Sequence, residues 1–147
     1  VGGRQLLDLS MGFGAMFAGH LNPTVIEEIQ SSLTTGMLFV TPSPISTDAA
    51  EMICKRFKID QVRFTNSGTE STMYAVRVAR SATDKMGILK VEGGYHGSYD
   101  PFVVSSKPAL DKAGDPEEPR AVIDSNLVPG DIYVVPYNNV AALEAMF

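Results

Sequence analysis

Several features that many proteins carry are scarce in this chain of 147 residues. It holds one cysteine, Cys54, so no disulfide can form within it, and the place of Cys54 in an apparent helix favours a buried structural thiol. Basic residues are outnumbered by acidic ones, 12 against 17, which argues against a nucleic-acid partner or an anionic membrane surface. No apolar run approaches membrane-spanning length.

Two other kinds of signal are weak or missing. The two histidines lie in distant loops and the cysteine in a helix, so we expect no metal site. No leader pattern follows Val1, so we expect an intracellular, cytoplasmic protein. The absent initiator Met and the abrupt ends suggest a piece of a longer chain, and the 44% hydrophobic content suits one domain or part of one.

Apolar residues recur along the chain with the helical period and the strand period in turn. We expect helices near 23–34, 46–57, 68–82 and 138–147, and strands near 5–10, 61–65, 86–92 and 132–135. The expected helix caps are Asn22 for the first helix, Ser46 or Thr47 for the second and Asn138 or Asn139 for the last, with Gly36 ending the first. Residues 105–129 are polar and read as a long surface excursion. Strands that alternate with helices indicate an α/β fold with a mostly parallel sheet.

The stretch Gln61–Ala82 carries the strongest chemical signal. It begins like a strand, turns at residues 66–68 and continues as a helix. The first N–H groups of that helix have no partner within it and favour an anion beyond the end of the strand. Gly68 allows close approach, and Ser67 and Thr69 add hydroxyl donors, which together predict a phosphate site. A capping box of Ser67 and Glu70 explains the same residue types without any ligand, and both interpretations stay open.

Two further segments are rich in glycine. After the apolar run at 86–91, a loop with three glycines presents the pair Tyr95-His96 at a strand end. The glycines of Met11–Asn22 do not have the spacing of a dinucleotide fingerprint, and we read an irregular segment that passes close to another group.

Four motifs now coincide in order. They are Gly19-His20-Leu21-Asn22-Pro23, then Thr65-Asn66-Ser67-Gly68-Thr69-Glu70 with Ala79-Arg80, then Gly94-Tyr95-His96-Gly97, then Val135-Pro136-Tyr137-Asn138. In this order and at these separations the chain resembles the class III aminotransferases, which are fold-type I enzymes that use pyridoxal 5′-phosphate. Within that class it looks closest to glutamate-1-semialdehyde aminomutase and similar enzymes. The resemblance covers essentially all 147 residues.

The resemblance implies a fold, an activity and an assembly. The fold would be a three-layer α/β arrangement, with residues 1–35 leading into the family's large domain and residues 36–147 forming part of that cofactor-binding domain. The activity would be amino-group transfer on an amino acid or amino-keto substrate. The family works as a homodimer, so the apolar segments Met11–Phe17 and Met37–Pro44 would lie against a partner chain, although core packing within the monomer explains them equally well.

The resemblance also implies roles for residues. Ser67, Gly68 and Thr69 would hold the cofactor phosphate, and Tyr95 would lay its ring against the pyridine ring. His96 would shape the same wall, or be a loop histidine satisfied by backbone partners. Glu70 is expected to cap and position the helix, and His20 to hold its own loop.

The catalytic group of the family is not expected in this chain. The Schiff-base lysine and the aspartate that pairs with the pyridine nitrogen would lie beyond the position matching Phe147, and none of the six lysines stands in the family's lysine context. By itself the chain is expected to be inactive. A non-catalytic phosphate-binding α/β module and a ligand-free interaction fragment remain the alternatives.

Overall fold

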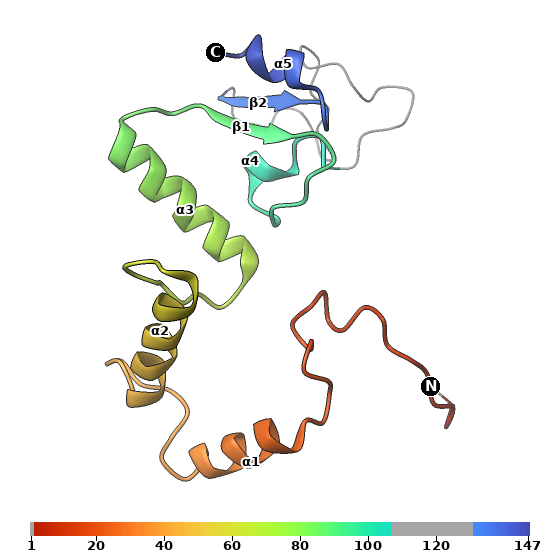
Figure 1. Cartoon of the computed structure of the whole chain (residues 1–147), viewed down its shortest axis with the longest axis vertical. Helices are drawn as coiled ribbons and strands as arrows, with labels where there is room; N and C mark the ends of the chain where they lie inside the picture. Colours follow the sequence, from red (N-terminus) through yellow and green to blue (C-terminus); the bar gives the residue numbers. More distant parts are fainter. Residues whose placement is uncertain (1, 107–130) are drawn as a thin grey trace. The chain divides into compact units, whose positions relative to one another are not determined.

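The computed structural model describes residues 2–106 and 131–147. Its elements in chain order are α1 (Pro23–Ser32), α2 (Pro44–Phe57), α3 (Gly68–Thr83), β1 (Ile88–Val91), α4 (Asp100–Val103), β2 (Ile132–Val135) and α5 (Val140–Glu144) (Figure 1). Contacts divide the chain into two compact units, Val1–Val62 and Arg63–Phe147. Within the described ranges no helix is long and apolar enough to cross a bilayer.

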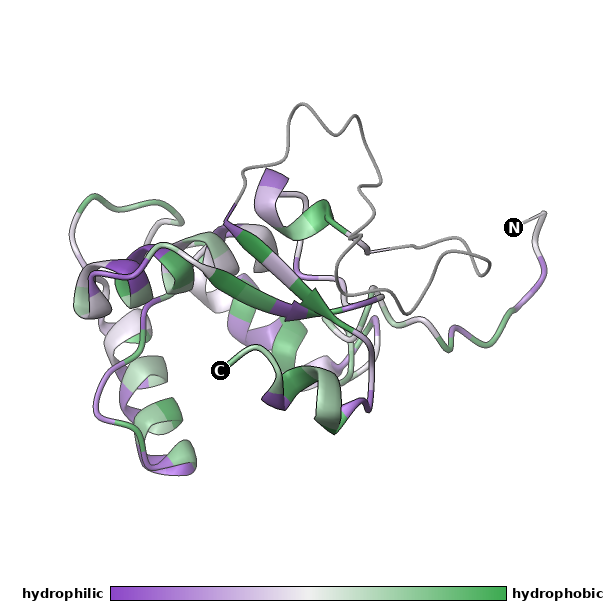
Figure 2. Cartoon of the chain, turned by 90° about the horizontal axis from the view of Figure 1, so that it is seen from above, coloured by the Kyte–Doolittle hydropathy of each residue, from purple (hydrophilic) through white to green (hydrophobic). Residues whose placement is uncertain are grey.

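A parallel pair of strands lies at the centre of the second unit. β1 pairs with β2 in a register that runs from Ile88 opposite Ile132 to Val91 opposite Val135. Both strands are largely apolar (Figure 2). β2 is buried at three of its four positions, whereas Lys90 is the only buried residue of β1. Because side chains alternate along a strand, Ile88 and Lys90 share one face of the sheet and Leu89 shares the other with Val91.

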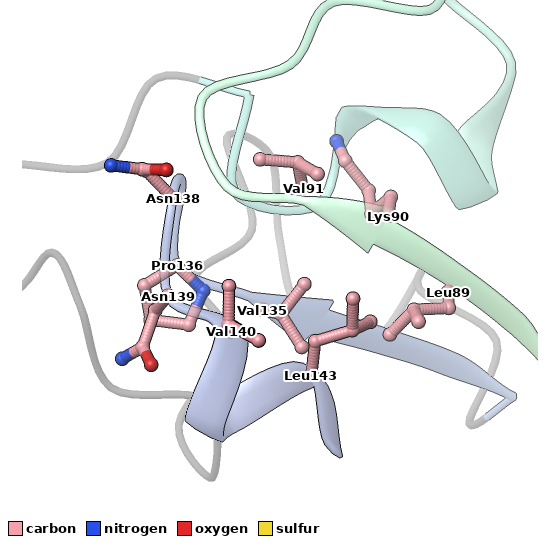
Figure 3. Close-up of a pocket in the computed structure, with 9 residues that line it drawn as sticks. All are labelled: Leu89, Lys90, Val91, Val135, Pro136, Asn138, Asn139, Val140 and Leu143. Carbon is pink, nitrogen blue, oxygen red and sulfur yellow. The ribbon is translucent and has the colours of Figure 1, made fainter. Parts of the chain in front are cut away.

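Helical segments cover both faces of this sheet. On the face of Ile88, the buried side chain of Val104, which follows α4, packs with Ile132 and Val134. On the opposite face, α5 and the strands enclose a pocket of about 230 Å³ (Figure 3). Its lining is mostly apolar and includes Leu89, Val91, Val135, Val140 and Leu143. The prediction of α/β layering around a parallel sheet is confirmed.

In this unit, α3 and α5 begin with a side chain that caps the helix. Ser67 is the N-cap of α3, and its Oγ accepts a hydrogen bond from Glu70 N at 3.1 Å. At the other end, Asp84 adopts the left-handed conformation (φ 55°) and donates its N–H to the Arg80 carbonyl. The N-cap of α5 is Asn139, one of the two predicted residues, whose Oδ1 accepts from Ala142 N at 3.0 Å.

In the first unit, one predicted cap is confirmed and another is wrong. Asn22 caps α1 through a 3.3 Å bond from Val25 N, as predicted. The cap of α2 is Ser43 and not Ser46 or Thr47: Ser43 Oγ accepts from Ser46 N, and Ser46 Oγ accepts in return from Ser43 N. The helix starts earlier because Pro44 occupies its first position, where a missing N–H costs nothing.

Two predicted strands are wrong. Residues 5–10 and 61–65 form no strand, because the described chain offers them no neighbour with which to form a hydrogen-bonded ladder. Several boundaries also move. The strand predicted at 86–92 spans 88–91, the helix predicted at 138–147 spans 140–144, and α1 ends at Ser32 rather than near Gly36. The short helix α4 was not predicted. The excursion predicted at 105–129 lies almost entirely outside the described residues.

Cys54 is half-buried, so the expectation of a buried thiol is met only in part. The division of the chain at residue 62 reflects contacts within this chain. The domain boundary expected at residue 35 stays a prediction.

Asp8 organises the glycine-rich segment that precedes α1. Its Oδ1 accepts from Ser10 N at 2.9 Å and Met11 N at 3.0 Å, and its Oδ2 lies 2.7 Å from His20 Nε2. This contact ties the two ends of a segment in which Met11 and Phe13 adopt positive φ. His20 therefore holds its own loop, as expected. The hydrogen bond from His20 lowers the pKa of the Asp8 carboxyl, and the backbone N–H groups of Met11 and Ser10 lower it further.

We predict that His20→Ala raises the pKa of the Asp8 carboxyl toward its ordinary value of 3.8, because the largest cause of the shift is removed. The lowered pKa stabilises the folded segment at pH values above the ordinary pKa of Asp8, and this stabilisation is lost as the pH falls through the lowered pKa. Carbon NMR titration of the Asp8 carboxyl measures both variants. Ser10→Ala, which keeps its backbone N–H, is the control; equal Asp8 titrations in the His20→Ala and native proteins would contradict the assignment.

Candidate functional site

Two segments far apart in the sequence meet at the start of α3. The Thr69 hydroxyl oxygen accepts a 3.1 Å hydrogen bond from the backbone N–H of Ser98. One turn further, the Thr72 hydroxyl lies 2.8 Å from the His96 carbonyl oxygen. These contacts join the turn predicted to bind phosphate to the loop that presents Tyr95, so the structure brings both groups of predicted residues together.

Gly97 is the point of closest approach between the two segments. A Cβ atom at Gly97 would lie 2.5 Å from Thr69 Oγ1 and 2.7 Å from Thr69 Cα, both shorter than any tolerated contact. Its φ of 99° also falls in the left-handed region that only glycine adopts without strain. The loop can therefore rest against the first turn of α3 only because residue 97 has no side chain.

The first turn of α3 keeps free donors on its outer side. Ser67 uses its hydroxyl oxygen to accept from Glu70 N and its carbonyl to accept from Ser71 N. Among the residues that the structure describes, the N–H groups of Gly68 and Thr69 have no acceptor. The hydroxyls of Ser67 and Thr69 each accept one bond and keep a proton to donate. Two amides and two hydroxyls of this turn thus keep a proton to donate.

The space in front of Gly68 is open. A Cβ atom built on Gly68 meets no atom within 4 Å, and the residue does not lie in the left-handed region. Neither backbone conformation nor packing within this chain therefore requires glycine at this position. The open space lies beside the two free N–H groups at the positive end of a helix of 16 residues, and a phosphate group fits that chemistry.

Glu70 caps the turn in a different way from that predicted. Its Oε2 accepts from Asn66 N at 2.9 Å, one residue before the N-cap, and not from the Ser67 N–H of a regular capping box. The Ser67 half of the box is present. The two interpretations of this turn are compatible, because capping uses the Ser67 lone pair and the Glu70 carboxylate, whereas an anion would use N–H and O–H protons.

Tyr95 and His96 differ in how they are held. The Tyr95 side chain is 72% exposed, so its ring has a free face. The His96 ring lies edge-on to Phe102, with centroids 6.0 Å apart, and its Nε2 fills the space that a Cβ at Gly94 would need, only 2.9 Å away. His96 is therefore positioned through ring packing and through its carbonyl, held by Thr72.

Sequence reasoning missed two residues of this site. Thr72 lies three residues after Thr69, and that helical spacing was the available signal that both hydroxyls share one face. Lys90 is a single charge inside an apolar strand and is 5% exposed, and it lies directly behind the loop of Tyr95.

Within residues 2–106 and 131–147, no group of three or more His, Cys, Asp and Glu side chains is placed to hold a metal.

We predict that Gly97→Ala lowers the free energy of unfolding by about 1–3 kcal/mol, because its methyl group would overlap Thr69 and force the loop off α3. The control is Gly68→Ala, which meets no atom and should leave that free energy unchanged or raise it by up to about 1 kcal/mol. Urea denaturation measures both. Equal stabilities for Gly97→Ala and the native protein would show that the loop does not rest on Thr69.

Comparisons with known proteins agree on one family. The family model for aminotransferase class-III matches residues 1–140. Glutamate-1-semialdehyde 2,1-aminomutase from Methanothrix thermoacetophila is 37% identical over 148 residues, covering 97% of this chain and 33% of that protein. The chain thus spans about a third of the length of this curated relative.

Solved structures give the same picture. An omega-transaminase from Sphaerobacter thermophilus superposes with a TM-score of 0.80 at 33% identity, over 95% of this chain and 33% of that one. A structure described as a transaminase with PLP bound gives a TM-score of 0.74 at 34% identity, over 87% of this chain and 30% of that one.

Proposed function

This chain belongs to the class-III aminotransferase family, and we propose that it forms the phosphate-binding and ring-binding part of a pyridoxal 5′-phosphate-dependent aminotransferase or aminomutase. The relatives named as aminomutases and transaminases support a reaction that moves an amino group on an amino acid or amino-keto substrate. One observation carries the proposal for this chain's own residues. Two unpaired N–H groups and an open space at Gly68 adjoin the loop of Tyr95.

Ser67, Gly68 and Thr69 would bind the phosphate of the cofactor. The N–H groups of Gly68 and Thr69 and the protons of the two hydroxyls would donate to its oxygens, at heavy-atom distances of about 2.7–3.2 Å. The helix dipole adds a favourable potential at the same place. Glu70 would not compete with the phosphate, because its carboxylate is already engaged by the Asn66 N–H.

Tyr95 would lie against the ring of the cofactor and His96 would shape the wall beside it. Since Thr69 and Thr72 fix this loop to α3, the phosphate site and the ring site keep one separation. The cofactor supplies a ring that takes up an electron pair when a bond to the substrate's α-carbon breaks. We place the lysine that joins the cofactor covalently outside residues 1–147.

We propose a homodimer as the working assembly. In the single chain, the segments Met11–Phe17 and Met37–Pro44 expose large apolar side chains, among them Phe13 (104% exposed), Leu38 (94%) and Val40 (106%). Large apolar side chains that are exposed to this extent need a cover, and we assign it to a second copy. A monomeric mass for the protein from the complete open reading frame, measured by light scattering, would contradict this assignment. The cytoplasmic location stays a prediction.

The test uses the protein expressed from the complete open reading frame, stripped of cofactor. We predict that Gly68→Val weakens pyridoxal 5′-phosphate binding by at least about tenfold, because its side chain fills the open space in front of two charge-assisted donors. Tyr95→Ala should weaken cofactor binding while leaving inhibition by inorganic phosphate unchanged, because it removes only the ring contact. Absorbance titration gives the cofactor affinity, and phosphate competition gives the affinity of the phosphate site.

Gly68→Ala and thermal unfolding of every variant serve as controls for folding. A Gly68→Val protein that binds the cofactor as tightly as the native protein would overturn the assignment of the phosphate site. Phosphate binding without any cofactor binding in the native protein would favour the alternative of a non-catalytic phosphate-binding module. Binding of neither would favour a ligand-free interaction fragment.

A further inference from the structure

The ammonium group of Lys90 is enclosed by oxygen atoms behind the loop of Tyr95. Its Nζ donates to the carbonyl oxygens of Gly94 at 3.1 Å, Phe102 at 2.8 Å and Val104. A fourth oxygen, Ser106 Oγ, lies 3.3 Å away and itself donates to the Phe102 carbonyl. An ammonium has three protons, and the three carbonyls match that number.

This arrangement links the loop that follows β1 to the end of α4 through a side chain of β1. Gly94 directly precedes Tyr95, while Phe102 and Val104 lie at the end of α4. A second contact, from Gly93 N to the Ser105 carbonyl at 2.7 Å, holds the same two segments together. Figure 3 shows the Lys90 side chain directed away from the apolar pocket of α5 and toward α4.

His96 is bordered on both sides by residues that Lys90 holds. Its ring packs edge-on to Phe102, and its Nε2 stands against Gly94. The carbonyl groups of these same two residues accept from the Lys90 ammonium. A shift of either residue would therefore move the His96 ring and the adjacent Tyr95.

The chemistry of this position calls for a cation. Burial alone lowers the pKa of Lys90, because an ammonium loses its hydration, so an apolar residue would be cheaper to bury here. At the end of α4, the carbonyl oxygens of Phe102 and Val104 accept from Lys90 Nζ, and carbonyl groups at a helix C-terminus favour a positive charge. An apolar replacement would remove the Lys90 donor from the Gly94 and Val104 carbonyls and would leave the Phe102 carbonyl with the Ser106 hydroxyl alone.

We propose that Lys90 is a positioning residue whose buried ammonium fixes Gly94 and the end of α4, so that Tyr95 and His96 stand at the correct distance from the phosphate site. This inference rests on the proposed function, because it concerns how the ring of the cofactor is held. The nitrogen is enclosed by its acceptors, so the role is one of position and not of covalent chemistry. The phosphate site itself is built on α3 and does not depend on Lys90.

The experiment compares two affinities in cofactor-free protein from the complete open reading frame. Lys90→Met is expected to weaken pyridoxal 5′-phosphate binding by about tenfold or more, because the ring contact is misplaced. Its inhibition constant for inorganic phosphate should change by less than about twofold, because α3 keeps its donors. Lys90→Gln keeps two donors and should fall between Lys90→Met and the native protein. If Lys90→Met does not fold, the two affinities of Lys90→Gln are compared with those of the native protein instead.

The exposed lysine Lys85, replaced as Lys85→Met, is the matched control and should leave both affinities unchanged. Native cofactor affinity in both Lys90 variants would overturn the proposal while leaving the proposed function intact. Cofactor and phosphate affinities that fall by the same factor would show a general loss of folding, and would also overturn it. Failure of the native protein to bind the cofactor would instead overturn the proposed function.

Discussion

The contact between the first turn of α3 and the loop after β1 is the constraint on which the candidate site depends. Thr69 accepts from the Ser98 N–H, Thr72 bonds the His96 carbonyl, and Gly97 lies between them with no room for a side chain. Without this contact, the turn at residues 67–69 and the exposed Tyr95 would be two unrelated loops. With it, one face of α3 fixes the separation between the proposed phosphate site and the exposed ring of Tyr95.

The two sides of this contact differ in charge and in hydrogen bonding. On the α3 side the donors are neutral amides and hydroxyls at the positive end of a helix dipole, which is the chemistry that we propose for holding a phosphate. Behind the loop, the Lys90 ammonium is buried among carbonyl oxygens and is therefore a fixed part of the framework. The Lys90 charge is thus solvated by carbonyl oxygens of α4 and Gly94 rather than offered to a ligand.

The parallel sheet positions the segments that follow its two strands. Parallel strands carry their carboxyl ends to the same edge, so the segment after β1 and the segment after β2 emerge together. Buried Val104, Ile132 and Val134 hold the end of α4 against one face, and α5 lies over the other. Among the residues that the structure describes, the apolar segments of the first unit stay exposed, and this exposure is the basis on which we propose a second copy as their cover.

Local signals in the sequence were sufficient to predict the features that depend on residues a few positions away. The caps at Asn22 and Ser67, the period of α3 and the apolar runs of β1 and β2 follow from side chains acting on their own backbone. The order of the motifs was sufficient to predict the family.

Tertiary structure alone decided the rest. Strand character at 5–10 and 61–65 requires a pairing partner, and the need for glycine at 97 arises from Thr69, far away in sequence. The role of Lys90 is likewise decided by tertiary structure, because the sequence does not show which acceptors its ammonium group meets at Gly94 and α4.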